Sequence, residues 1–182
     1  MAMPLRLAMV VLGFALTAIA AQFTTTVPFT AVPLTLTPIA VLLTGAALGS
    51  RLGAASQVAY VVAGAMGFSV FSPSAILPPG FGRLVGPTGG YLMAYPLAAF
   101  VTGWLSEHGW DRRYLTSLGA MAAGLAVIYI GGVSWLSAAV LHSFSGAVNA
   151  GLLPFVVLDV LKITAAAMIL PRVWRRFDSR VG

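Results

Sequence analysis

The chain has 182 residues, of which 59% are hydrophobic and only 8% are charged, and its mean hydropathy is +0.97. So little polar surface excludes a soluble domain and predicts an integral membrane protein embedded in a lipid bilayer. The absence of cysteine excludes disulfides and thiolate metal sites, and no other metal site is expected. The net charge of +6 does not indicate nucleic-acid binding, because the basic residues form no polar face with interleaved aromatics. Cytoplasmic loops rich in arginine explain the charge better.

Long apolar runs predict an all-α bundle of six transmembrane helices in a single domain. A long first apolar run, followed by a segment rich in threonine and proline, argues against a cleavable signal. The second run is too short to cross the bilayer upright as a regular helix. The expected spans lie at about residues 4–22, 38–49, 52–71, 91–106, 114–142 and 151–170.

The distribution of arginine predicts the orientation of this bundle. If both termini are cytoplasmic, the inner segments hold eight arginines, whereas the outer loops hold Arg83 alone. An excess of positive charge on the inner side is the usual pattern in membrane proteins. We therefore expect cytoplasmic N and C termini in a bacterial-type plasma membrane, with Arg83 as the cation at the outer mouth.

A stripe of small residues follows one face of the first span. Gly13, Thr17 and Ala21 recur at every fourth position, so they lie above one another on a helix. Small side chains let a second helix approach closely in lipid. We expect the stripe to form part of a docking face for a partner protein. Packing against another helix of the same chain is the alternative explanation.

Asp159 and Lys162 place a carboxylate and an ammonium group inside the apolar sixth span. A charge near the centre of a bilayer costs roughly 2.5–3.5 kcal/mol on insertion scales, so such residues usually face a partner or a ligand. Positions three apart share a helix face, which allows both groups to point into one cavity. The pair predicts a binding site, although mutual neutralisation within the bundle is an alternative.

The turn Gly86-Pro87-Thr88-Gly89-Gly90-Tyr91 precedes the fourth span. Gly89 and Gly90 let the backbone approach a ligand, and the N–H groups at a helix start favour polar or anionic groups. A turn of this composition can also merely connect two helices. Its Thr-Gly-Gly-Tyr resembles a potassium-filter loop, but nothing else predicts a pore helix or a fourfold assembly.

Enzyme chemistry is not predicted. His142 has no paired histidine for a metal, no Gly-x-Ser-x-Gly elbow occurs, and Ser145-Gly146 lacks a base on a separate helix. No phosphate-binding Gly-x-x-x-x-Gly-Lys-[Ser/Thr] loop occurs, so no nucleotide cofactor is expected and any ATP would be hydrolysed by another chain. The remaining alternatives are a transporter driven by separate ATPases and a stand-alone transporter that couples a small anionic vitamin or metabolite to protons through Asp159.

Motifs in several parts of the chain carry a family resemblance. They are Val41-Leu42-Leu43-Thr44-Gly45, Leu48-Gly49-Ser50-Arg51-Leu52-Gly53, Tyr60, Gly64, Gly67, the Gly86–Tyr91 turn, and Pro154-Phe155 through Asp159 and Lys162. Over roughly residues 27–165 the chain resembles the BioY family, the biotin-binding S components of energy-coupling-factor (ECF) transporters. It departs from the family pattern at Thr37-Pro38 and at Ser69.

The resemblance implies high-affinity capture and uptake of biotin, with an ECF transmembrane coupling protein and two ATPase subunits as partners. Biotin would be the transported ligand and not a cofactor. An ionised Asp159 would accept the ureido N–H groups, and Lys162 would donate to the ureido oxygen or balance Asp159. Biotin would then enter ring first, and its carboxylate would stay near Arg83, assisted by the N–H groups of Gly89 and Gly90.

The same resemblance suggests how the rest of the pocket is built. Tyr91 and Trp135 are candidates for the walls around the sulfur ring. Residues 23–34 and 72–90 are expected to close over the occupied pocket, where exclusion of water strengthens each polar contact.

Overall fold

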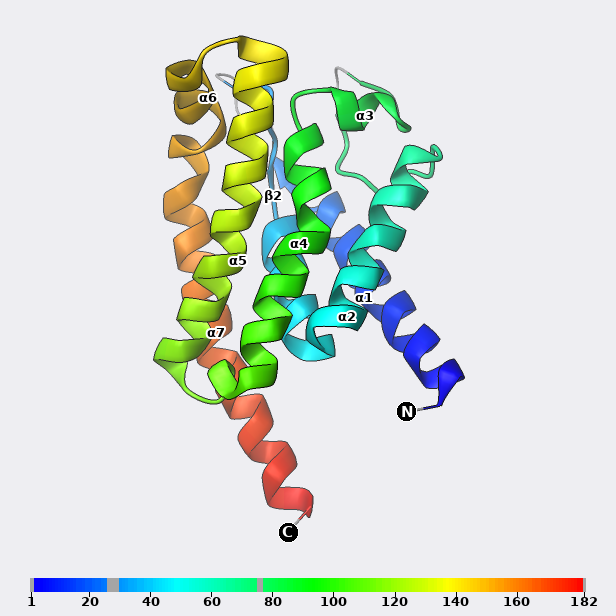
Figure 1. Ribbon diagram of the computed structural model, residues 1–182, viewed down its shortest axis with the longest axis vertical. Coiled ribbons are helices and arrows are strands. Elements are labelled where there is room, and N and C mark those ends of the chain that lie inside the picture. The colour runs from blue at the N-terminus through cyan, green and yellow to red at the C-terminus, as the bar shows by residue number, and fades with distance from the viewer. Residues whose placement is uncertain (1, 26–29, 75–76, 182) are drawn as a thin grey trace.

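The computed structural model describes residues 2–25, 30–74 and 77–181, and it describes side chains up to Leu170. Figure 1 shows helices packed side by side as one bundle. The short strands β1 (Thr24–Thr25) and β2 (Leu34–Thr35) pair antiparallel. The helices in chain order are α1 (Met3–Gln22), α2 (Thr37–Ala65), α3 (Gly82–Val85), α4 (Gly89–Leu105), the π-helix η1 (Ser106–Trp110), α5 (Tyr114–Trp135), the π-helix η2 (Leu136–Leu141), α6 (Phe144–Gly151) and α7 (Leu153–Val181).

Within the described residues, four helical segments are long and apolar enough to cross a membrane. They are Met3–Gln22, Thr37–Ala65, Tyr114–Leu141 and Leu153–Leu170. Large apolar side chains such as Leu12, Ile130 and Leu161 are each more than 60% exposed, which suits lipid and not water. The chain is therefore a mostly helical, multi-pass membrane protein.

The helices differ from the predicted spans in number and in bounds. The described residues form seven labelled α-helical elements: the short α3 and α6 were not predicted, and α2 joins two helices that meet at Gly49, where the expected second span ends. Helices as short as α3 and α6 give no signal in an analysis that looks for apolar runs long enough to span a bilayer. The last helix, expected to end near residue 170, continues to Val181.

The chain reverses its direction inside α2, at Gly49. This residue has φ 82° and ψ 175°, a conformation that is essentially restricted to glycine. After the reversal the two halves of α2 run side by side, since a Cβ added to Gly53 would lie 2.8 Å from Gly45 Cα. Glu107 of η1 accepts hydrogen bonds from the Ser50 backbone N–H (2.8 Å) and hydroxyl (2.9 Å), and so satisfies the start of the second half. Element α2 is thus a helical hairpin.

The small-residue stripe of α1 faces α2. Gly13, Thr17 and Ala21 are all buried, and Gln57 Nε2 of α2 donates to Thr17 Oγ1 at 2.9 Å. A Cβ added to Gly13 would lie 2.6 Å from Thr44 Cγ2. These contacts contradict the predicted docking role of the stripe. They agree with the alternative explanation, packing against another helix of the same chain. The small side chains allow α1 and α2 to approach so closely that the stripe has no free surface.

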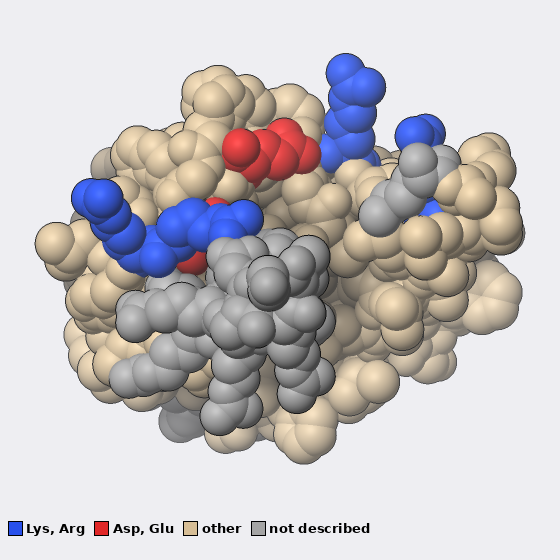
Figure 2. Space-filling model, turned by 90° about the horizontal axis from the view of Figure 1, so that it is seen from below, with Lys and Arg blue, Asp and Glu red and all other residues tan. Residues whose placement is uncertain are grey.

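The two ends of the bundle differ in character. Both termini lie toward the lower end in Figure 1, together with the connection between α4 and α5, whereas β2, α3 and the first turns of α4 lie toward the upper end. Figure 2 views the lower end and shows basic and acidic side chains standing on it. Arg6, Arg51, Arg112 and Arg113 are exposed. The functional site described below lies toward the other end.

Candidate functional site

A pocket opens among β2, α4, α5 and α7, and residues from α2, α3 and the segment after α2 complete its wall. Its cavity volume is about 50 Å³. Its walls are mainly aromatic and aliphatic, with a few polar groups. The apolar and aromatic lining includes Tyr60, Tyr91, Leu92, Tyr95, Ile128, Tyr129 and Phe155, and the polar lining includes Thr35, Thr37, Ser72, Arg83, Thr88 and Asp159.

One end of the pocket is acidic. Asp159 of α7 is buried, and its Oδ1 is 2.8 Å from the Lys162 ammonium group, one helical turn further along. Its Oδ2 accepts a hydrogen bond of 2.7 Å from the Tyr129 hydroxyl of α5. The Lys162 ammonium group also donates to the Thr35 carbonyl at 2.9 Å, which connects α7 to β2. The predicted pair therefore shares one face of α7, and its carboxylate is held by groups from two helices.

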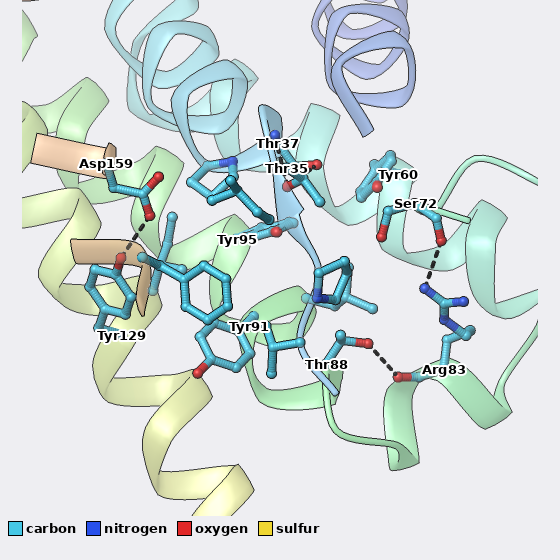
Figure 3. A pocket seen from close by; sticks show the side chains of 17 residues that line it. Thr35, Thr37, Tyr60, Ser72, Arg83, Thr88, Tyr91, Tyr95, Tyr129 and Asp159 are labelled. Atoms are coloured by element: carbon cyan, nitrogen blue, oxygen red, sulfur yellow. Dashed lines mark hydrogen bonds between the residues drawn. The ribbon is translucent and has the colours of Figure 1, made fainter. Parts of the chain in front are cut away.

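The other end of the pocket holds a cation. Figure 3 shows Arg83, from α3, on the opposite side of the pocket from Asp159. Arg83 is only 4% exposed, and its guanidinium donates to the carbonyls of Ser72 (2.7 Å) and Leu77 (3.3 Å). Burial lowers the pKa of Arg83 from its ordinary value, and the nearby Tyr60 opposes that shift. An arginine side chain nevertheless stays charged near neutral pH.

The glycine-rich turn packs against Trp135. The Trp135 indole Nε1 donates to the Gly86 carbonyl at 3.0 Å, and the Gly89 N–H is bonded to that same carbonyl at 3.0 Å. Cβ atoms added to Gly89 and Gly90 would meet the Leu84 backbone and the Trp135 side chain. The two glycines thus allow Trp135 to approach the backbone closely, and these three residues are not among the described residues that line the pocket.

Tyr91, which ends the same turn, does line the pocket. Its hydroxyl donates to the Gly151 carbonyl at 2.8 Å, so it connects α4 to the junction between α6 and α7. Of the residues predicted from the sequence, the structure brings Asp159, Arg83 and Tyr91 to one pocket. Lys162 lies against Asp159, whereas Trp135 supports the turn from behind.

Several lining residues were not singled out as binding residues from the sequence. Tyr129 and Tyr95 lie on α5 and α4, Thr35 ends β2, and Thr37 is the first residue of α2. A phenol hydroxyl within an apolar span needs a hydrogen-bond partner, so the tyrosines carried a signal that could have marked them as candidates. The identity of the partner was not visible, because Tyr129 and Asp159 are 30 residues apart.

A profile of the BioY family matches residues 2–179. The chain belongs to the BioY family. This membership agrees with the resemblance that the motifs indicated. A relative named probable biotin transporter BioY, from Pyrococcus horikoshii, is 40% identical over 164 residues, which cover 90% of this chain and 93% of the relative. The biotin transporter BioY of Thermotoga maritima is 40% identical over 143 residues, which cover 79% of this chain and 81% of the relative. Both relatives are named as transporters and neither as an enzyme.

The fold of this BioY-family chain also has a counterpart among solved structures. A crystal structure described as the S-component for biotin from an ECF-type ABC transporter superimposes with a TM-score of 0.83. The match covers 96% of this chain and 95% of that chain, at 20% identity. At this level of identity the likeness concerns the fold.

Proposed function

We propose that this chain captures biotin with high affinity from the outer side of the membrane, as the S component of an ECF-type transporter. The observation that carries the proposal is a pocket with an acidic acceptor at one end and a buried cation at the other, in a chain of the BioY family. Biotin has complementary ends, a ureido group with two N–H donors and a tail that ends in a carboxylate. The two relatives named as biotin transporters support the same ligand.

In this proposal the ureido ring binds at the acidic end of the pocket. Asp159 accepts one of the two N–H groups, which point apart on either side of the ureido carbonyl, and Lys162 balances its charge close to the ureido oxygen. The biotin carboxylate pairs with Arg83, whose guanidinium carries more N–H donors than its bonds to Ser72 and Leu77 use. Tyr91 contributes to the apolar wall along the sulfur ring. Gly89, Gly90 and Trp135 support the turn that carries Tyr91.

The proposal includes an arrangement in the membrane. Counting the two halves of α2 separately, the chain makes six crossings, and both termini face the cytoplasm of a bacterial-type plasma membrane. The exposed arginines at the end that holds the termini support this orientation under the positive-inside rule. The pocket then opens toward the outer side.

A binding measurement on the purified chain tests whether biotin is the ligand. In isothermal titration calorimetry, biotin should bind with a stoichiometry of one, and an excess of thiamine or riboflavin should not displace it. Asp159→Asn should weaken biotin binding by about ten- to a hundredfold, because it weakens the charge-assisted hydrogen bonds to the ligand. No binding of biotin, or equal competition by riboflavin, would contradict the proposal.

An uptake measurement tests whether transport requires the proposed partners, a transmembrane coupling protein and two ATPase subunits. The sequence of this chain has no phosphate-binding loop, so ATP hydrolysis would belong to other chains. Labelled biotin should accumulate in cells that express all the subunits, and accumulation should stop when the ATPase phosphate-binding lysines are replaced. Uptake that needs no ATP and collapses with the proton gradient would instead identify a proton-coupled transporter.

A further inference from the structure

Tyr60 of α2 places a phenol hydroxyl without a protein partner at the cationic end of the pocket. The residue lines the pocket and is 0% exposed, and Figure 3 shows it on the same side as Arg83, away from Asp159. Among the described residues, none forms a hydrogen bond with the Tyr60 hydroxyl, whereas the hydroxyls of Tyr91 and Tyr129 each donate to a protein acceptor. A buried hydroxyl without a partner is unfavourable, so this one favours a bound ligand that completes its hydrogen bonding.

Three aromatic rings hold the Tyr60 ring in place. The ring centroids of Phe14, Phe71 and Tyr95 lie 6.4, 5.3 and 6.3 Å from that of Tyr60. Phe14 belongs to α1 and Tyr95 to α4, whereas Phe71 lies in the segment after α2. Close packing from three directions leaves the ring little freedom, so its orientation is set before a ligand binds. A group fixed in advance loses little conformational entropy on binding.

The charge of Arg83 decides which part of a ligand can lie at this end. Tyr60 and Arg83 interact electrostatically, so they lie near one another. A guanidinium has N–H donors and no acceptor, so the ligand group that faces Arg83 is an acceptor, and an anion suits it best. A phenol hydroxyl can donate to the same group. A carboxylate has two oxygens and several acceptor positions, so it can bind both residues at once.

We propose that Tyr60 is a further ligand-binding residue, which donates its hydroxyl to the biotin carboxylate beside Arg83 and makes the site selective for the free acid over its esters. The proposal rests on the proposed function, because it requires biotin to bind in this pocket. A hydrogen bond to a charged acceptor is roughly twice as strong as one to a neutral acceptor. The carboxylate therefore gains more from Tyr60 than the carbonyl of an ester does.

The test compares two ligands on two chains. Biotin and its methyl ester are titrated by calorimetry into the purified wild type and into Tyr60→Phe, which keeps the ring and removes only the hydroxyl. The affinity for biotin should fall by about tenfold, and the affinity for the ester by no more than about threefold, because the ester accepts the weaker hydrogen bond. The steric cost of the methyl group is common to both chains and cancels in the comparison.

The stability of the ligand-free chain separates ligand binding from a structural role. Because the Tyr60 hydroxyl has no partner among the described residues, Tyr60→Phe should leave the unfolding temperature in detergent unchanged or raise it. Tyr91→Phe should lower it, since that change removes the hydrogen bond to the Gly151 carbonyl. Tyr114→Phe removes a hydroxyl at an exposed position outside the pocket, and it should leave both affinities unchanged.

The outcomes distinguish this proposal from the proposed function. Equal loss of affinity for biotin and its ester in Tyr60→Phe, or no loss for either, would overturn the role of Tyr60. A lower unfolding temperature of ligand-free Tyr60→Phe would also overturn it, because the hydroxyl would then have a structural partner. Failure of biotin to bind the wild type would instead count against the proposed function.

Discussion

Among single residues, the two ends of the pocket differ in hydrogen-bonding character, so they suit different groups of a ligand. Asp159 offers acceptor positions at one end, and Arg83 offers donors at the other. Because the two groups lie on opposite sides of the pocket, each should report on a different part of biotin. The direction in which biotin lies can therefore be tested by changing one group at a time.

Arg83→Ala and Asp159→Asn should discriminate differently between biotin and its methyl ester. Arg83→Ala should lower the affinity for biotin by about tenfold or more and leave the affinity for the ester nearly unchanged, since the ester has no charge to pair with Arg83. Asp159→Asn should lower the affinity for both ligands by the same factor, because both keep the ureido group. Affinities from calorimetry give the comparison. Biotin lies the other way round if Arg83→Ala weakens both ligands equally, or if Lys162→Ala is selective for the free carboxylate.

At the scale of elements, the hairpin in α2 depends on the backbone of Gly49. A side chain at φ 82° and ψ 175° strains the backbone, and a Cβ added there would also meet a Glu107 carboxylate oxygen. Gly49→Ala should therefore lower the free energy of unfolding by about 1–3 kcal/mol. Thermal unfolding of the purified chain in detergent measures the loss.

Two other glycines provide controls for this substitution. Gly67 has φ 99° but open space around the position of a Cβ, so Gly67→Ala isolates the backbone strain from the contact with Glu107. Gly82 has neither a positive φ nor a neighbour within 4 Å, so Gly82→Ala should leave the unfolding temperature nearly unchanged. If Gly49→Ala is as harmless as Gly82→Ala, the reversal at Gly49 does not need glycine.

At the scale of the whole molecule, the connections on the pocket side join distant helices. The segment before α2 is attached to α7 through the hydrogen bond between Lys162 and the Thr35 carbonyl. It also reaches the end of α6, where Thr30 Oγ1 donates to the Ala150 carbonyl at 2.7 Å. Arg83 holds the segment after α2 through Ser72 and Leu77. These bonds place both connections around the pocket.

The predicted closure of residues 23–34 and 72–90 over biotin remains a prediction, and residues 26–29 and 75–76 lie outside the described residues. Ligand binding should slow amide hydrogen exchange in the described parts of both segments, because a closed pocket excludes water from their backbone. Exchange in η1, at the opposite end, should be unchanged and serves as the internal control. Equal exchange in both segments with and without saturating biotin would count against a lid.

The class of the protein, a helical membrane protein, and part of the pocket could be predicted from the sequence, because both depend on local patterns. The length of the apolar runs identified a multi-pass membrane protein. The spacing of Asp159 and Lys162 placed both groups on one helix face, since positions three apart always share a face. Gly49 also acted through its own backbone, because its φ of 82° and ψ of 175° favour glycine whatever packs around it.

The tertiary structure alone decided which faces of the helices meet. It turned the Gly13, Thr17 and Ala21 stripe toward α2, placed Trp135 behind the turn, and brought Tyr129 to Asp159. In water, an apolar stripe shows which face of a helix is buried. In a bilayer the lipid is as apolar as the protein interior, so hydrophobicity does not distinguish the face that meets another helix from the face that meets lipid. The rotation of each helix about its own axis therefore depends on close packing and on hydrogen bonds between residues far apart in the sequence.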